Sequence, residues 1–208
     1  MLLNESARHH CSMRVIAGRY RSRPIQSLPG LDIRPTSDRL RETLFDVLCA
    51  GNIEALAGSI WFDLYAGTGA VGIEALSRGA GWVTFVESSG KAARLIERNL
   101  ASLSIEACFT VMQMDVGSAL RKFQVAGMSG DYVFLDPPYR MKEAYQDTME
   151  ALSKSRLLHA STLVVAEHDR KFDPGEAFGN LLRFRKLEQG DAALSFYKLS
   201  PASAVSNE

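Results

Sequence analysis

The sequence predicts an α/β protein whose central sheet is mostly parallel. From about residue 60 onward, short apolar stretches alternate with amphipathic ones. Such an alternation favours parallel β-α-β units joined by right-handed crossovers. Near the C-terminus, two further apolar stretches surround Gly190-Asp191 and predict an antiparallel hairpin. We therefore expect a mostly parallel seven-stranded sheet with an antiparallel C-terminal hairpin, which puts one antiparallel strand in the sheet.

The elements follow one another in a regular order. In the first of them, the apolar residues Leu40, Leu44, Phe45 and Leu48 recur at helical spacing after a possible cap at Thr36 or Ser37. Expected helices cover 38–49, 71–78, 89–102, 116–124 and 142–158. Expected strands cover 60–65, 82–86, 109–114, 131–135, 162–166, 182–187 and 193–199.

Length and composition indicate one globular domain with a small appendage. The chain has 208 residues, of which 46% are hydrophobic and 23% charged, a profile that excludes whole-chain disorder. Three widely spaced cysteines without a C-x-x-C pair argue against a zinc site and favour a reduced, cytoplasmic protein. No apolar run approaches the roughly 20 residues of a membrane span, so we expect no membrane partner.

The N-terminal part is strongly basic although the whole chain is neutral. Residues 1–41 contain eight arginines, no lysine and three acidic residues, which leaves a net charge of −5 for the remainder. Arginine binds phosphate with two N–H groups, so this pattern favours a phosphate-binding appendage over chance clustering. We expect a flexible extension over 1–13, a basic β-hairpin and loop over 14–37, the main domain over 38–200 and a flexible tail over 201–208.

A glycine-rich turn follows the first expected strand. After Asp63 and Tyr65, the residues Gly67, Gly69 and Gly72 spell G-x-G-x-x-G before a helix. The missing side chains let a ligand lie against backbone N–H groups. Both dinucleotides and S-adenosylmethionine bind at such turns, and a purely structural turn is a third possibility.

Two acidic residues follow the next two strands. Glu87 lies 20 residues after Gly67, where a carboxylate can accept hydrogen bonds from both ribose hydroxyls of an adenosine. Asp115 can accept from an adenine amino group, or it can cap the following helix, and the two roles are compatible.

The motif Asp136-Pro137-Pro138-Tyr139 follows the fourth strand and points to a reaction. An exocyclic amine on a base is a poor nucleophile because its lone pair is delocalised into the ring. The Asp136 carboxylate and the Pro137 carbonyl could accept its two N–H bonds, and Tyr139 offers a face on which a flipped base can stack. Orientation of this kind can contribute roughly 7–11 kcal/mol. The motif therefore favours methyl transfer to a base.

Residues 14–199 resemble the bacterial small-subunit rRNA guanine-N2 methyltransferases of the RsmD family. Besides the glycine turn and the D-P-P-Y motif, the likeness is carried by RVIAG at 14–18 and by RPTSDRLRETLF at 34–45. Ser22 stands where that family commonly has a glycine, and Ser88-Ser89 follow Glu87 where Asp or Asn is common.

The resemblance implies a Rossmann-like class I methyltransferase fold and a monomeric enzyme that methylates 16S rRNA, within the small ribosomal subunit or an assembly intermediate. Catalysis is assigned to Asp136, Pro137 and Tyr139, and S-adenosylmethionine binding to Asp63, Tyr65, Gly67, Gly69, Gly72, Glu87 and Asp115. RNA binding is assigned to Arg14, Arg19, Arg21, Arg23, Arg34, Arg39 and Arg41, and no metal is expected.

Three other functions compete with this interpretation. A DNA adenine-N6 methyltransferase can use the same D-P-P-Y chemistry, although the chain has little room for a separate target-recognition domain. An assembly factor could bind rRNA without catalysis. A nicotinamide-dependent dehydrogenase would use the glycine turn and has no need of the D-P-P-Y motif.

Overall fold

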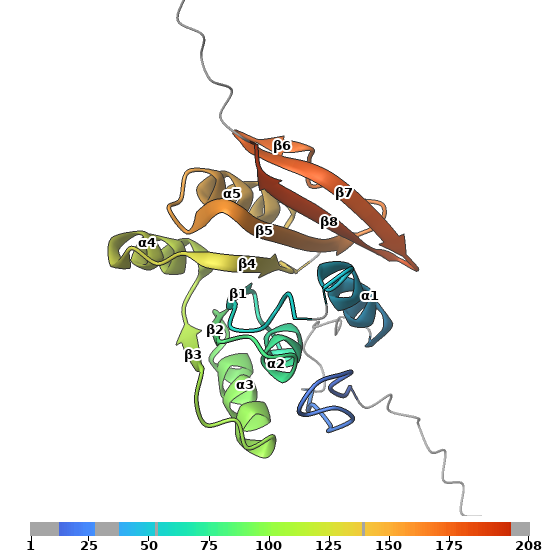
Figure 1. The fold of residues 1–208 in the computed structure, drawn as a ribbon. Coiled ribbons are helices and arrows are strands. Elements are labelled where there is room, and N and C mark those ends of the chain that lie inside the picture. Colours follow the sequence, from blue (N-terminus) through green and yellow to red (C-terminus); the bar gives the residue numbers. More distant parts are fainter. Residues whose placement is uncertain (1–12, 28–37, 53, 139, 201–208) are drawn as a thin grey trace, which may run out of the picture.

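The computed structural model describes residues 13–27, 38–52, 54–138 and 140–200. A single mixed sheet runs through the molecule in the order β3-β2-β1-β4-β5-β8-β7-β6 (Figure 1). Its first five strands are parallel and its last three antiparallel, which confirms the mostly parallel sheet. The strands are β1 (Ile60–Leu64), β2 (Trp82–Glu87), β3 (Phe109–Gln113), β4 (Gly130–Leu135), β5 (Leu158–Asp169), β6 (Ala177–Phe178), β7 (Leu181–Gln189) and β8 (Ala192–Leu199).

The sheet has eight strands where the sequence predicts seven. The additional strand is β6, whose two residues pair with the start of β7 across a turn at Gly179. Two residues are too few for an alternating pattern, so the sequence carries no signal for it. β5 is also longer than expected, because its far end pairs with β8 as far as Asp169 and Ala192.

Helices cover both faces of the sheet (Figure 1). Apolar side chains of α1 (Asp38–Leu48), α2 (Ala70–Ser77) and α3 (Gly90–Ser102) contribute to one buried cluster with Phe134 and Val165 of the sheet. Those of α4 (Val116–Ala126) and α5 (Lys142–Ser153) contribute to the other with Val133 and Val164. Since neighbouring strand residues point to opposite faces, the two clusters are the two sides of the sheet.

Residues 13–27, here called the arm, form a minimal hairpin. The backbone N–H of Val15 donates to Arg23 O at 3.0 Å, and that of Ile25 donates to Met13 O at 2.8 Å. These bonds flank a single antiparallel bridge between residues 14 and 24. Ser22 adopts a φ of +66°, so the turn keeps the left-handed conformation that glycine favours even though serine occupies it.

The arm is packed into the main domain. Val15 and Ile25 are buried in the cluster that includes α1 and α2. Asn99 of α3, fully buried, donates from Nδ2 to Gln26 O at 3.1 Å and to Thr68 O at 2.9 Å, and its Oδ1 accepts from Gln26 N–H at 2.9 Å. One side chain therefore links the arm to the turn before α2.

Gly72 allows α2 to pack closely on the sheet. A Cβ atom at this position would lie 2.3 Å from Cε1 of Phe85 on β2. We expect Gly72→Ala to lower the free energy of unfolding by about 3 kcal/mol, the upper end of the usual cost of overpacking, as measured by urea denaturation. Gly127→Ala is the control, because open space surrounds that position and only its φ of +63° costs stability, about 1 kcal/mol. Equal losses in the two variants would contradict the packing role.

Candidate functional site

A cavity of about 1040 Å³ lies at the carboxyl ends of the parallel strands. Its walls come from the turn after β1, the end of β2, the segment after β3, the D-P-P-Y motif after β4, and α5. Open α/β sheets place their ligands at this edge, where the chain leaves successive strands. Of the residues predicted from sequence, Asp63, Tyr65, Gly67, Glu87, Asp115, Asp136 and Pro137 line the cavity.

The glycine turn has the conformation that its sequence predicts. Gly67 and Gly69 have φ values of +56° and +78°. Tyr65, before the turn, also has a positive φ of +64°, which is strained for a residue with a side chain. Its hydroxyl lies 2.7 Å from Oγ1 of Thr148 on α5, so Tyr65 spans from the turn to the opposite wall. Sequence reasoning did not identify Thr148, because an isolated threonine in a helix carries no signal.

Glu87 accepts hydrogen bonds from the glycine turn. Its Oε2 accepts from the backbone N–H of Gly67 at 2.9 Å, and its Oε1 accepts from that of Ser89 at 2.7 Å. The backbone N–H of Gly67 therefore already donates to the Glu87 carboxylate and is not available to bind a phosphate at this turn. Glu87 keeps free lone pairs on both oxygens, which suit hydroxyl donors such as those of a ribose.

Asp63 stabilises the same turn through a hydrogen bond to its last glycine. Its Oδ2 accepts from the backbone N–H of Gly72 at 2.9 Å, so an internal carboxylate caps the start of α2. Burial, with a smaller contribution from the charge of Glu87, raises the pKa of Asp63 to about 8. Gly69 and Gly72 shape this turn and are not themselves part of the cavity wall.

Asp115 caps α4. Its Oδ1 accepts from the backbone N–H of Ser118 at 2.8 Å, and this hydrogen bond holds the pKa of Asp115 below its ordinary value. The helix-capping prediction is thus confirmed. The same side chain lines the cavity beside Met114 and Val116, so its free oxygen can still meet a ligand.

The D-P-P-Y motif is held by α5. Pro137 O accepts a hydrogen bond from the hydroxyl of Tyr145 at 3.2 Å, and the same hydroxyl donates to Glu167 O of β5 at 2.9 Å. Burial, followed by the nearby charges of Glu167 and Asp63, raises the pKa of Asp136 well above its ordinary value. Tyr139 lies outside the described residues. Tyr145 was missed from sequence because it occupies an apolar position of its helix.

The cavity is acidic. Among the described residues, its wall contains five carboxyl groups and one guanidinium, contributed by Asp63, Glu87, Asp115, Asp136, Asp147 and Arg140. These carboxyl groups can accept hydrogen bonds from hydroxyl groups, and those that are ionised attract a positive charge and repel a pyrophosphate. S-adenosylmethionine, a sulfonium with a ribose, has these properties. A nicotinamide dinucleotide fits the wall poorly.

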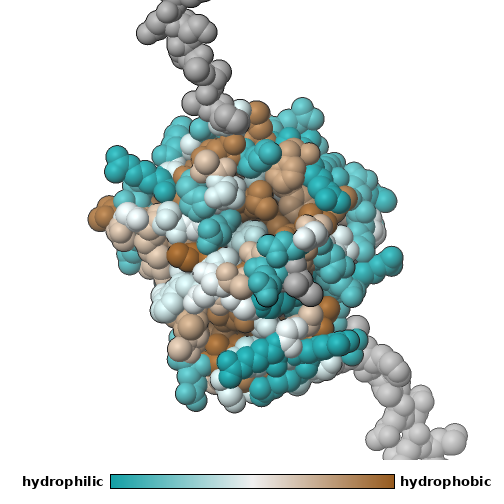
Figure 2. All heavy atoms as spheres, viewed as in Figure 1, coloured by the Kyte–Doolittle hydropathy of each residue, from teal (hydrophilic) through white to brown (hydrophobic). Residues whose placement is uncertain are grey.

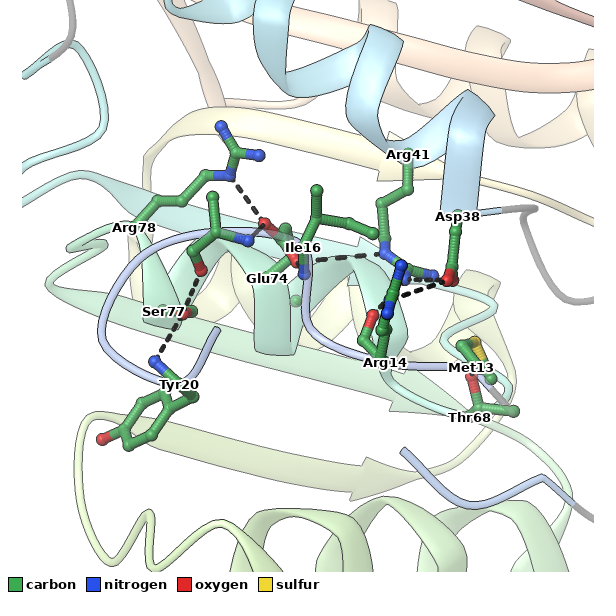
Figure 3. A network of polar contacts seen from close by, with 12 residues as sticks. Met13, Arg14, Ile16, Tyr20, Asp38, Arg41, Thr68, Glu74, Ser77 and Arg78 are labelled. Carbon is green, nitrogen blue, oxygen red and sulfur yellow. Dashed lines mark hydrogen bonds and ion pairs between the residues drawn. The ribbon is translucent and has the colours of Figure 1, made fainter. Parts of the chain in front are cut away.

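The predicted RNA-binding role of Arg41 is wrong. Its side chain is fully buried, and it donates to the Asp38 carboxylate at 2.8 Å and to Arg14 O at 2.6 Å. Its Nε lies 4.0 Å from Oε2 of Glu74 (Figure 3). Glu74 also accepts from the backbone N–H groups of Ile16 and Ala17, at 2.7 and 2.9 Å. Arg41 therefore serves the attachment of the arm, because its guanidinium has no access to solvent.

The other predicted arginines differ in exposure. Arg23 is half-buried and donates to the backbone O atoms of Ser102 and Leu103 at the end of α3, a helix-capping role. Those that remain exposed are Arg14, Arg19, Arg21 and Arg39, and Arg34 lies outside the described residues. On the visible face, hydrophilic side chains gather where the arm and α3 lie (Figure 2).

No helix among the described residues has the length and apolar character that a membrane crossing requires. Within the same part of the chain, no three His, Cys, Asp or Glu side chains are arranged to hold a metal ion.

Comparisons with known proteins identify the sequence relatives of the chain. The model of the family described as Conserved hypothetical protein 95 matches residues 13–198. Ribosomal RNA small subunit methyltransferase D of Escherichia coli (strain K12) is 33% identical over 188 residues, covering 89% of this chain and 89% of that protein. YlbH of Bacillus subtilis (strain 168) is 32% identical over 186 residues, covering 89% of this chain and 98% of that protein.

Solved structures share the fold. YhhF of Escherichia coli superposes with a TM-score of 0.77 at 30% identity, covering 91% of this chain and 98% of its own. SMU.776, solved in complex with SAH, superposes with a TM-score of 0.62 at 14% identity, covering 77% of this chain and 48% of its own. The similarity to SMU.776 is therefore one of fold alone. These superpositions confirm the Rossmann-like class I methyltransferase fold.

The raised pKa of Asp63 predicts a pH-dependent stability. Between pH values near 4 and 8 the folded state holds a proton that the unfolded chain releases, so stability falls as pH rises through this window. Asp63→Asn removes the ionisable group and keeps an acceptor for Gly72 N–H. Urea unfolding across this window should show the variant gaining at least about 1 kcal/mol over wild type with rising pH. Parallel curves would contradict the assignment.

Proposed function

The chain belongs to the family of ribosomal RNA small subunit methyltransferase D, and from that premise we propose that it methylates the exocyclic N2 amine of a guanine in 16S rRNA. The methyl donor is S-adenosylmethionine. The substrate is the rRNA within the small ribosomal subunit or an assembly intermediate, in the cytoplasm, and the enzyme acts as a monomer.

The observation that carries this proposal is that the D-P-P-Y motif and the adenosine-compatible carboxylates share one cavity. Asp136 and Pro137 line it together with Glu87 and Asp115. S-adenosylmethionine supplies an electrophilic methyl group bound to a sulfonium. Glu87 would accept from the ribose hydroxyls and Asp115 from the adenine amino group. An acidic wall favours the positive charge of the sulfonium.

The residues of the motif orient the target amine. The Asp136 carboxylate and Pro137 O would each accept one N–H bond from it, which directs the nitrogen lone pair away from these acceptors and toward the methyl group. As the new N–CH3 bond forms and the S–CH3 bond breaks, the amine acquires positive charge. Asp136 stabilises that charge and takes the proton that the amine loses. Tyr145 holds Pro137 O in place from the other side.

The target guanine reaches the cavity after it leaves the base stack. RNA sequence is read mostly from unstacked bases in loops, and the D-P-P-Y loop at the cavity wall would receive such a base. Tyr139 would stack on it. The exposed arginines Arg14, Arg19, Arg21 and Arg39 would bind phosphates of the surrounding RNA.

The competing functions are less well supported. A DNA adenine-N6 methyltransferase would need its own target-recognition elements, and the described chain forms one sheet with its covering helices. A dehydrogenase would need to place a pyrophosphate against five carboxyl groups. A catalytically inactive assembly factor would have no use for a paired Asp136 and Pro137 at the cavity wall.

The assay that tests this function follows a labelled methyl group from S-adenosylmethionine into unmodified 16S rRNA, assembled small subunits and duplex DNA. We expect N2-methylguanosine from rRNA or subunits. N6-methyladenine from DNA would overturn the proposal.

In the same assay, Asp136→Ala should lower transfer at least about a hundredfold, because it removes both the orienting acceptor and the proton acceptor. Its affinity for the uncharged thioether S-adenosylhomocysteine should change little. Full activity of this variant would refute the role of Asp136.

Replacement of Arg19 and Arg21 by glutamine tests the phosphate contacts of the arm. Each arginine that displaces a counterion contributes about 0.7 to the slope of log affinity against log salt for single strands. We expect the double variant to bind the RNA more weakly and to show a flatter slope in filter binding. Arg156→Gln, an exposed arginine outside the arm, is the control. A slope equal to that of wild type would show that these arginines do not contact phosphate.

A further inference from the structure

Three carboxyl side chains from adjacent strands point to the same face of the sheet. Asp63 of β1 pairs with Phe134 of β4, and Leu135 of β4 pairs with Ala166 of β5. The next residues outward are Asp136 and Glu167. Trp61, Phe134 and Val165 belong to the cluster on the α1–α3 side, and side chains alternate along a strand. Asp63, Asp136 and Glu167 therefore extend to that side as well.

Glu167 is the member of this set that the D-P-P-Y motif does not include. It is 3% exposed, whereas Asp136 is half-buried and lines the cavity. The Tyr145 hydroxyl, through its bonds to Pro137 O and Glu167 O, fixes the end of β5 against the motif. The backbone geometry thus keeps the two carboxyl groups as neighbours inside the protein.

Two carboxyl groups side by side, one of them buried and the other half-buried, are costly to ionise together. Among the groups that act on Asp136, Glu167 raises its pKa more than Asp63 does, and burial contributes most. For such a pair the protons are lost in two steps that belong to both groups. Only the ionised Asp136 carboxylate can take the proton that the amine loses, and it is also the stronger acceptor for the N–H bonds. The protonation state of the pair thus determines whether Asp136 can accept the proton of the substrate amine.

We propose that Glu167 is a positioning residue for methyl transfer, which shares a proton with Asp136 and so determines the pH above which Asp136 can take the proton of the target amine. This inference rests on the proposed function. When the amine loses its proton on methylation, Asp136 takes that proton and the pair holds it until it passes to water. Further titratable groups near this pair are Asp63 on β1, Glu87 on β2 and Arg140 after the motif.

Glu167→Gln tests the inference through the pH dependence of methyl transfer. Glutamine keeps the size of the side chain and removes its charge, so Asp136 should ionise at lower pH. We expect the acidic limb of the pH–rate profile to move down by about one pH unit or more. Tyr145→Phe is the matched control: it removes the hydroxyl that bonds to Pro137 O and Glu167 O and leaves the charges in place. This control should lower the rate without moving the limb.

An unmoved limb in Glu167→Gln, or an equal shift in Tyr145→Phe, would overturn the inference. Absence of methyl transfer by wild type would instead refute the proposed function, so the two failures are distinguishable. Circular dichroism at each pH separates an altered profile from unfolding of the variant.

Proton release on ligand binding gives a second readout that needs no turnover. S-adenosylmethionine and S-adenosylhomocysteine differ by one positive charge, and a cation in the cavity favours ionised Asp136. Calorimetry in two buffers of different ionisation enthalpy should show more protons released by the sulfonium than by the thioether in wild type. The difference should shrink in Glu167→Gln. An undiminished difference would place the shared proton elsewhere and refute the pairing.

Discussion

Parallel pairing of β1 with β2 and β4 is the constraint on which the site depends. It aligns the carboxyl ends of these strands, so that Asp63, Glu87 and Asp136 arrive at one edge from positions far apart in the chain. The turns and helices that follow the strands then enclose a common cavity. The same alignment brings carboxyl groups together in a poorly hydrated space, which raises the pKa values of Asp63 and Asp136 and favours a cationic ligand.

A fourth buried acid shows how the fold treats a carboxylate that is purely structural. Glu74, fully buried on α2, is paired with Arg78 at 2.7 Å and receives two backbone N–H groups from the arm. Its charge is therefore compensated within the protein. Among the described residues, neither Asp63 nor Asp136 forms a salt bridge, and their pKa values are raised. Glu74, whose charge is compensated by an arginine, thus has a structural role, whereas the uncompensated Asp63 and Asp136 are available for binding and chemistry.

The sheet and most of the cavity could be predicted from the sequence because both depend on local patterns. Apolar alternation marks strands, and the G-x-G-x-x-G and D-P-P-Y motifs mark strand ends, where the topology brings ligands. Burial could not be predicted in the same way: Arg41 has the same residue type as the exposed Arg39, and only tertiary packing against Glu74 separates them. Tyr145 was not identified, and Glu167 was interpreted only as a polar strand end, since their roles depend on contacts between α5, β4 and β5.

The side chain of Asn99 joins the arm to the glycine turn. Through one amide group it donates to the carbonyl of Thr68, inside the glycine turn, and to that of Gln26, in the arm. Displacement of either segment would break hydrogen bonds made by the same buried side chain that holds the other, so the position of the arm and that of the glycine turn depend on each other.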